Sequence, residues 1–220
     1  MKKKIKILIV AAHADDEVLG VGGFISNLDK KKHEIKVVFL TNGLITDREE
    51  KNISNKKDAH KACKFLGIKD IIFLNYKDQR LDTIPISEIA NKLNNLKLDP
   101  DIIFTHNGKD LNKDHLITYE AVKIISRPKK KKISLICFEI PMNNSWNFNM
   151  FKPNYYVDIS KTLKIKMKAL KAYSNENKKL PNPVSLEGIK ILAQFRGLES
   201  GFKYAEGFEI KRLYHLNIFK

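Results

Sequence analysis

The chain has 220 residues, of which 43% are hydrophobic and 30% are charged, so it can bury one α/β core and should be soluble. No apolar run approaches the roughly 18–20 residues of a membrane-spanning helix, and an apolar stretch that runs into His13 does not fit a signal peptide. The only two cysteines, Cys63 and Cys137, exclude a disulfide framework and a thiolate zinc site. We therefore expect a cytoplasmic protein without stable membrane insertion.

The formal net charge of +16 raises the question of nucleic-acid binding. The lysines stand in short runs at expected loops and element ends, and the chain has no recognition motif and no interleaving of aromatic and basic residues. We therefore interpret most of them as solvated surface lysines, with some attraction for anionic substrates, and predict no nucleic-acid partner.

Hydrophobic periodicity predicts strands that alternate with helices. The expected strands are 5–12, 35–41, 71–74, 102–105, 133–140, 156–159 and 208–213. The expected helices are 18–28, 47–66, 85–96, 114–126, 161–173 and 186–195, the last with Gly197 as its cap. This alternation is typical of a Rossmann-like, doubly wound, mostly parallel sheet with helices on both faces.

The pattern changes after Pro141, where an aromatic and asparagine-rich stretch has no clear periodicity. We find no internal repeat and no low-complexity tract that would mark a second domain. We predict a single domain over residues 1–220, in which residues 141–220 form a C-terminal extension that covers the ligand edge of the sheet.

Histidines and carboxylates gather where two predicted strands end. They are His13, Asp15 and Asp16 after the first strand, and His106, Asp110, Asp114 and His115 after the strand 102–105. Because ligands bind at the carboxyl ends of strands in such sheets, these side chains can face one crevice. Nitrogen and oxygen donors without thiolate suit a catalytic zinc site with an open water position. His33 and His60 are expected at the surface.

Two alternatives remain beside metal chemistry. One histidine alone would more often be a hydrogen-bonded structural residue, but three at strand ends with several carboxylates favour a metal site. Gly20, Gly22 and Gly23 suggest a nucleotide-binding module, yet His13–Glu17 fill the turn in which a G-x-G-x-x-G fingerprint would stand. A basic nucleic-acid-binding module is the other non-catalytic alternative.

Two separated motifs point to a known family. Residues 12–17 read A-H-A-D-D-E and residues 112–115 read N-K-D-H. They resemble the signatures A-H-P-D-D-E and [HN]-x-D-H of the PIG-L/LmbE-like zinc-dependent N-acetylglucosaminyl deacetylases, with Ala14 in place of proline. The similarity continues through residues 78–82, 146, 158–159, 196–197 and 204–206, and so covers nearly the whole chain.

The resemblance implies a metal-dependent hydrolase that removes an acetyl group from an N-acetylated amino sugar or its conjugate. The implied ligands of Zn²⁺ are His13, Asp16 and His115, and iron could occupy the same ligands. Asp15 would be the general base for attack by a zinc-bound water. Either Asn112, as a neutral donor, or His106, as a protonatable one, would stabilise the oxyanion. Glu17 and Asp114 would orient ligands or cap helices.

Three further residues are candidates for substrate binding: Arg48, Arg80 and Trp146, which lie in expected loops near the crevice. Such side chains suit sugar hydroxyls, a phosphate and a pyranose face. Alternatively, Arg80 pairs with Asp78 or Asp82, and Trp146 closes the core. The expected partner is a small N-acetylated sugar conjugate, and a homo-oligomer is compatible with the sequence.

Overall fold

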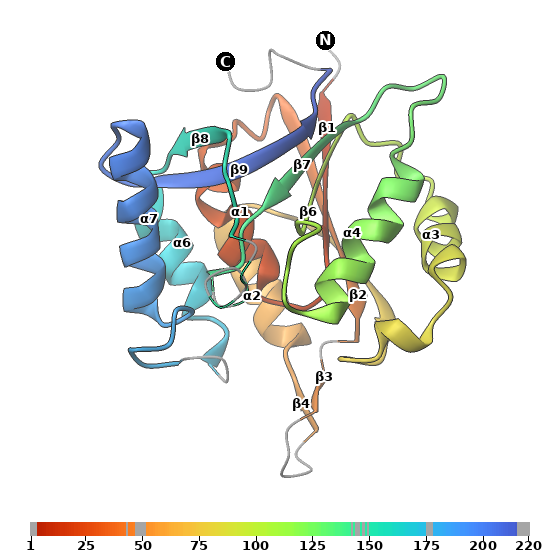
Figure 1. The fold of residues 1–220 in the computed structure, drawn as a ribbon, viewed down its shortest axis with the longest axis horizontal. Coiled ribbons are helices and arrows are strands. Elements are labelled where there is room, and N and C mark those ends of the chain that lie inside the picture. Colours follow the sequence, from red (N-terminus) through yellow and green to blue (C-terminus); the bar gives the residue numbers. More distant parts are fainter. Residues whose placement is uncertain are drawn as a thin grey trace.

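The computed structural model describes residues 4–42, 44–46, 52–141, 143, 146, 148, 150–174 and 178–214. Seven strands form one sheet in the order β5-β2-β1-β6-β7-β9-β8 (Figure 1). They are β1 (Ile5–Ala11), β2 (His33–Thr41), β5 (Asp70–Tyr76), β6 (Ile102–Thr105), β7 (Ser134–Phe138), β8 (Tyr155–Asp158) and β9 (Ala205–Arg212). A separate antiparallel hairpin consists of β3 (Leu44–Thr46) and β4 (Asn52–Ser54).

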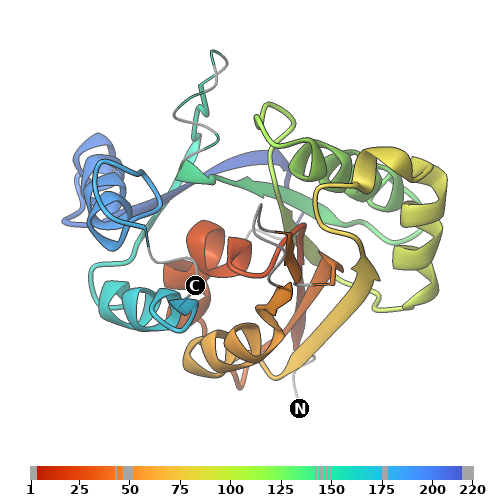
Figure 2. The same cartoon turned by 90° about the horizontal axis from the view of Figure 1, so that it is seen from below.

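Helices cover both faces of this sheet (Figure 2). The helices are α1 (Asp16–Asn27), α2 (Lys56–Leu66), α3 (Ile86–Asn95), α4 (Lys113–Ile125), α6 (Leu163–Leu170) and α7 (Leu186–Ser200), with a 3₁₀ turn at Leu81–Thr83. Successive side chains of a strand point to opposite faces. Ile7 and Ile9 of β1 accordingly pack in the core beside α1, α2 and α6, whereas Leu8 and Val10 pack beside α3 and α4. The predicted fold class is confirmed.

The strand order reverses between β1 and β6, which pair in parallel at the centre of the sheet. The chain leaves β1 for α1 on one face, and it leaves β6 for α4 on the other face. A crevice forms at such a switch point, outside the carboxyl ends of the strands. Within the seven-stranded sheet, β9 departs from parallel pairing, because it runs antiparallel to both β7 and β8.

Helix α1 packs closely on its neighbours at two of its three glycines. A Cβ added at Gly20 would lie 2.4 Å from the Phe138 ring, and one added at Gly23 would lie 2.7 Å from Ile159. These glycines therefore serve packing, as one expects where a helix approaches other elements closely.

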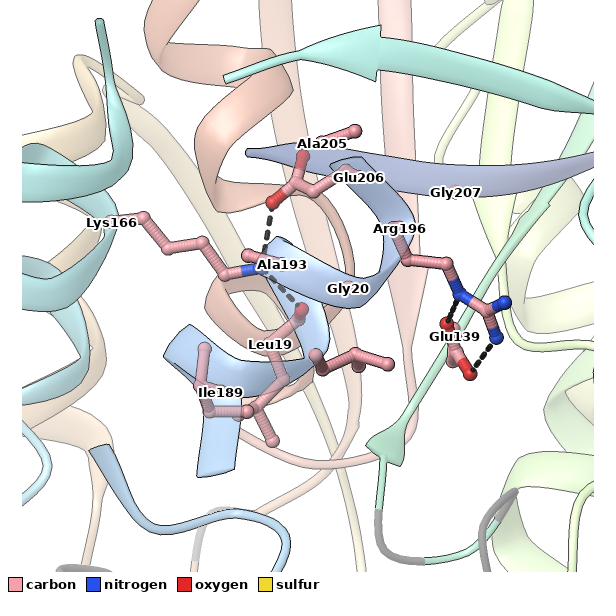
Figure 3. Close-up of a pocket in the computed structure, with 11 residues that line it drawn as sticks. Leu19, Gly20, Glu139, Lys166, Ile189, Ala193, Arg196, Ala205, Glu206 and Gly207 are labelled. Carbon is pink, nitrogen blue, oxygen red and sulfur yellow. Dashed lines mark hydrogen bonds and ion pairs between the residues drawn. The ribbon is translucent and has the colours of Figure 1, made fainter. Parts of the chain in front are cut away.

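A buried ion pair ties the C-terminal elements to α1 (Figure 3). Lys166 Nζ lies 2.6 Å from Glu206 Oε1 and donates to the Leu19 carbonyl at 2.7 Å. Glu206 also accepts the backbone N–H groups of Gly23 and Phe24 at 2.8 and 2.7 Å. A second buried pair lies beside it, in which Arg196 donates two hydrogen bonds to Glu139. In both pairs the charged groups form hydrogen bonds, which offset the cost of removing these charges from water.

We expect Lys166→Ala to lower the free energy of unfolding by about 3–5 kcal/mol, because it leaves the Glu206 carboxylate buried without its cation. Urea denaturation of the full chain measures this effect. The matched control is Lys164→Ala on the exposed side of the same helix, which should change stability by at most about 0.5 kcal/mol. Equal stability of the two variants would contradict the account.

Three sequence expectations about local structure are wrong. The segment expected as a helix from residue 47 contains β4, and α2 begins only at Lys56. Helix α7 does not stop before Gly197 but runs to Ser200, and Gly201 with φ 77° is its cap. His33 is buried rather than exposed, because it opens β2 and its Nδ1 bonds the Asp29 carbonyl.

Within the described ranges, no helix combines the length and apolar character needed to cross a bilayer.

Candidate metal centre

Three predicted metal ligands converge at the switch point. His13 follows β1, Asp16 lies in the first turn of α1, and His115 lies in the first turn of α4. His13 Nδ1 is 3.1 Å from His115 Nε2, and the Asp16 carboxylate lies 3.6 Å from the first nitrogen and 3.4 Å from the second. The three residues thus direct one donor atom each toward a common point.

The outer nitrogens of both imidazoles face carboxylates. His13 Nε2 is 2.9 Å from Asp78 Oδ1 and 3.1 Å from Asp114 Oδ2. His115 Nδ1 is 3.0 Å from Asp110 Oδ2, with the Asn143 side-chain amide at 3.2 Å. An N–H directed to a carboxylate leaves the lone pair of the other ring nitrogen facing inward. This arrangement is typical of histidines that bind metal.

The donor set fits a small divalent cation. Four-coordinate zinc with bonds of about 2.0–2.1 Å places its ligand atoms about 3.3 Å apart, close to the observed separations. Two inward lone pairs separated by only 3.1 Å repel each other unless a proton or a metal ion lies between them. The donors are nitrogen and oxygen, because the two cysteines are buried elsewhere and burial raises the pKa of both thiols.

Electrostatics keep the Asp16 carboxylate ionised. Burial by itself would raise its pKa, but His115 and His106 oppose this and hold the pKa well below its usual value. The pKa of His13 is raised: burial lowers it, but hydrogen bonds to Asp114, Asp16 and Asp78 outweigh burial. The raised pKa of His13 and the lowered pKa of Asp16 both mean that the carboxylates around this point favour positive charge there, which a bound cation would supply in place of a proton.

Asp15 has a strained backbone beside these ligands. Its φ of 132° lies in a region that non-glycine residues rarely adopt, at a cost of about 1–3 kcal/mol. The Asp15 N–H donates to Glu17 Oε2 at 3.0 Å, and its carbonyl accepts from Val18 and Leu19. Asp15 is half-buried, whereas Asp16 and Glu17 are buried. Asp15 is thus an acidic residue next to the metal ligands that is more accessible than Asp16 and Glu17.

Glu17 connects Asp15 to the C-terminal part of the chain through two hydrogen bonds. The buried hydroxyl of Tyr173 donates to Glu17 Oε1 at 2.5 Å, while Glu17 Oε2 accepts from the Asp15 backbone. Burial raises the pKa of Glu17 to about 7, although the Tyr173 hydroxyl opposes the rise. The side chain of Glu17 thus positions Asp15.

The two candidate oxyanion donors have different surroundings. His106 is fully buried, its ring stacks on that of His115 at 3.8 Å, and its Nε2 accepts the Ala12 N–H at 3.0 Å. Burial lowers the pKa of His106 to about 4, so its imidazole is neutral. Asn112 is half-buried and caps α4 by accepting the Asp114 N–H at its Oδ1. Its side-chain nitrogen therefore points away from the helix end.

Comparisons with known proteins show the family of this chain. The sequence profile described as "PIG-L: GlcNAc-PI de-N-acetylase" matches residues 8–126, more than half of the chain. The chain belongs to the PIG-L family. This membership confirms the resemblance of residues 12–17 and 112–115 and the predicted class of enzyme, a deacetylase.

Relatives of the PIG-L chain cover most of its length. It is 26% identical to diacetylchitobiose deacetylase of Thermococcus kodakarensis, over 92% of this chain and 81% of the relative. It is 27% identical to a probable N-acetyl-alpha-D-glucosaminyl L-malate deacetylase 2 of Bacillus subtilis, over 79% and 84% of the two chains. The solved structure of N,N'-diacetylchitobiose deacetylase from Pyrococcus horikoshii superposes with a TM-score of 0.77 at 26% identity, covering 98% and 87%.

The predicted substrate residues of this PIG-L chain lie in different surroundings. Arg48 is outside the described residues. Arg80 is exposed, and the described part of the chain shows no ion pair between it and Asp78 or Asp82. Trp146 is 57% exposed, so it does not close the core. The structural alternatives for Arg80 and Trp146 are therefore wrong.

Sequence reasoning gave no specific role to several residues that support the centre. Asp78 and Asp110 hold the outer nitrogens of the two histidines, and Asn143 and Tyr173 reach the site from the C-terminal part. Asp110 stands five residues before His115 in a polar loop, a spacing that could have suggested contact. Tyr173 gave no local signal, because its partner is 156 residues away in the sequence.

Proposed function

We propose that this PIG-L protein removes the acetyl group from an N-acetylated amino sugar conjugate with the help of one divalent cation. The converging donor atoms of His13, Asp16 and His115 carry this proposal. The relatives are named for diacetylchitobiose and for N-acetylglucosaminyl malate, which share an N-acetylglucosamine unit and differ in the group attached to it. A conjugate of N-acetylglucosamine is therefore the substrate class that we propose.

Zinc is the cation that we propose for His13, Asp16 and His115, because two imidazoles and one carboxylate are a common catalytic zinc set, and iron can use the same donors. When bound, the ion polarises the amide carbonyl and lowers the pKa of water. Asp15 takes the proton of the attacking water and returns it to the leaving amine. Its neighbour Asp16 cannot share this work, because the carboxylate of Asp16 is buried against three histidines.

Asn112 is the oxyanion donor that we propose. Its side-chain amide is neutral and half-exposed, so it can donate to the oxygen on which charge develops. His106 lies behind Asp16, with its Nε2 3.2 Å from the Asp16 carboxylate. Because this Nε2 already accepts the Ala12 N–H and the ring stacks on His115, we assign His106 to supporting the His115 imidazole from behind rather than to contact with substrate.

The proposal also covers the residues that bind substrate, the role of residues 141–220 and the cellular compartment. Arg80 and Trp146 are exposed in loops after β5 and β7, whose ends meet the same edge of the sheet, and together with Arg48 they suit a sugar. The contacts of Asn143 and Tyr173 support residues 141–220 as a cover for the ligand edge. The cytoplasm is the proposed compartment, since both cysteines are free.

The non-catalytic alternatives have little support. A nucleotide pyrophosphate would meet Asp15, Asp16 and Glu17 in the turn after β1, and these carboxylates repel phosphate. The matching family is described as a de-N-acetylase, and the two relatives compared above are named as deacetylases.

A substrate panel tests the proposal. Zinc-loaded protein is incubated with diacetylchitobiose, N-acetylglucosaminyl malate, an aryl N-acetylglucosaminide and an N-acetyl amino acid, and free amine is measured. We expect amine release from one or more of the sugars and none from the amino acid. Folded, zinc-loaded protein that releases no amine from any of the sugars would contradict the proposed class.

We expect Tyr173→Phe to lower kcat by about 10–100-fold with little change in KM, because the Glu17 carboxylate that positions Asp15 loses its hydroxyl donor. Metal content should stay unchanged. The matched control is Tyr156→Phe, whose hydroxyl bonds a carboxylate of Glu199 at 3.3 Å far from the centre. A kcat for Tyr173→Phe equal to that of the control would exclude this positioning role.

A further inference from the structure

A second hollow lies apart from the metal centre, between α6 and α7. Its volume is about 560 Å³, and it is lined by Ser160, Leu163, Lys164, Met167, Lys168, Lys171, Lys190, Lys203 and Tyr204. None of these residues contributes to the metal centre or to its supporting carboxylates. We call this hollow the lysine groove.

Five lysines and no acidic residue line the lysine groove. Two of their ammonium groups lie over aromatic rings, that of Lys168 over Phe65 at 4.5 Å and that of Lys203 over Tyr204 at 5.8 Å. Among the described residues, none of the five lysines forms an ion pair with a carboxylate, whereas some surface lysines elsewhere do. Lys131, for example, lies 2.9 Å from Asp99 and 3.2 Å from Asp101. Like charges gathered around one hollow repel each other, and an anion in the hollow would relieve that repulsion.

The spacing of the lysines shows how they face one ligand. Lys164, Lys168 and Lys171 recur at intervals of four and three residues, so they lie on one face of α6 and its last turn. Lys190 approaches from α7 and Lys203 from the segment before β9. The positive charge therefore comes from three separate segments around the hollow.

The remaining lining limits the class of anion. Leu163, Met167 and Tyr204 add apolar surface to the lining of the groove, and Ser160 adds a hydroxyl. A single carboxylate would neutralise only one of five cations, whereas a ligand with two or more phosphate charges engages several. Lysine ammonium groups bind phosphate as point charges.

We propose that the lysine groove is a binding site for a ligand that carries several phosphate charges, separate from the site of amide hydrolysis. Its source is either a soluble diphosphate compound or the headgroup of an anionic lipid, which share this chemistry. The site does not depend on the proposed deacetylase activity, because it has no residue in common with the metal centre.

The test compares wild type with two triple variants of equal charge. The groove variant is Lys164→Gln/Lys171→Gln/Lys190→Gln, and the control variant is Lys129→Gln/Lys130→Gln/Lys132→Gln. All six lysines are exposed, so both variants should fold. Calorimetry with inorganic pyrophosphate measures the soluble source. Flotation with phosphatidylcholine vesicles, with and without phosphatidic acid, measures the lipid source.

We expect wild type to bind one or both phosphate probes, and the groove variant to bind at least about tenfold more weakly, because three of five cations are removed. The control variant should bind within about twofold of wild type, and both variants should retain the amine release of wild type. Binding of pyrophosphate alone identifies a soluble ligand, and binding of phosphatidic acid vesicles alone identifies a lipid. Equal binding by all three proteins, an equal loss in both variants, or no binding of either probe by wild type would overturn the proposal.

Discussion

Asp15→Asn should lower kcat for amide hydrolysis by about 10²–10⁴-fold while the protein keeps its bound metal. The amide keeps the size and the backbone contacts of the aspartate, including the N–H donated to Glu17, but it cannot accept a proton. The loss should therefore appear in kcat, with little change in KM. Steady-state kinetics and metal analysis of the same preparation measure both quantities.

The neighbouring carboxylate provides the matched comparison. Asp16→Asn should lose tight metal binding as well as activity, because Asp16 faces both metal-directed nitrogens. If Asp15→Asn instead retained the activity of wild type, or lost metal as Asp16→Asn does, Asp15 would not be the general base.

His115→Ala should remove stoichiometric metal and lower kcat/KM roughly a thousandfold or more, since Lewis-acid assistance by the metal lowers the activation free energy by several kcal/mol. The change deletes one of two inward-facing nitrogens and leaves Asp16 and Asp110 without their shared partner. Metal analysis and amine release measure the two losses. A suitable control is His60→Ala, since His60 is exposed on α2 and should leave both quantities unchanged. Retention of bound metal by His115→Ala would contradict the ligand assignment.

The centre of the fold and of the site follows from sequence for a simple physical reason. Buried parallel strands are continuous apolar runs, so β1 and β6 could be located almost to the residue. The carboxyl ends of parallel strands share one edge, so residues just beyond them come together. That rule alone places His13 near His106 and His115 without any knowledge of contacts.

Local signals failed where one residue type serves two purposes. Gly197 was expected to end α7, yet a Cβ there would lie 2.6 Å from the Phe202 carbonyl, so this glycine allows a close approach inside the helix. Gly201, with φ 77°, supplies the left-handed cap instead. A single sequence does not distinguish these two uses of glycine.

Long-range support was also beyond sequence reasoning. The hydrogen bond from Tyr173 to Glu17 and the ion pair of Lys166 with Glu206 join segments that are 156 and 40 residues apart. Neither contact has a periodic pattern, because each depends on how the C-terminal helices pack on α1. A buried lysine in a helix is indistinguishable from a solvated one until that packing is known.

The most direct test of the account is metal removal and restoration in a single assay. The protein is stripped with a chelator, dialysed, and titrated with zinc while amine release from an N-acetylglucosamine conjugate is followed. We predict that activity disappears with the metal and returns in proportion to zinc up to a single ion per chain, and that His115→Ala shows no such return. Full amine release by the metal-free protein would contradict a catalytic metal at His13, Asp16 and His115.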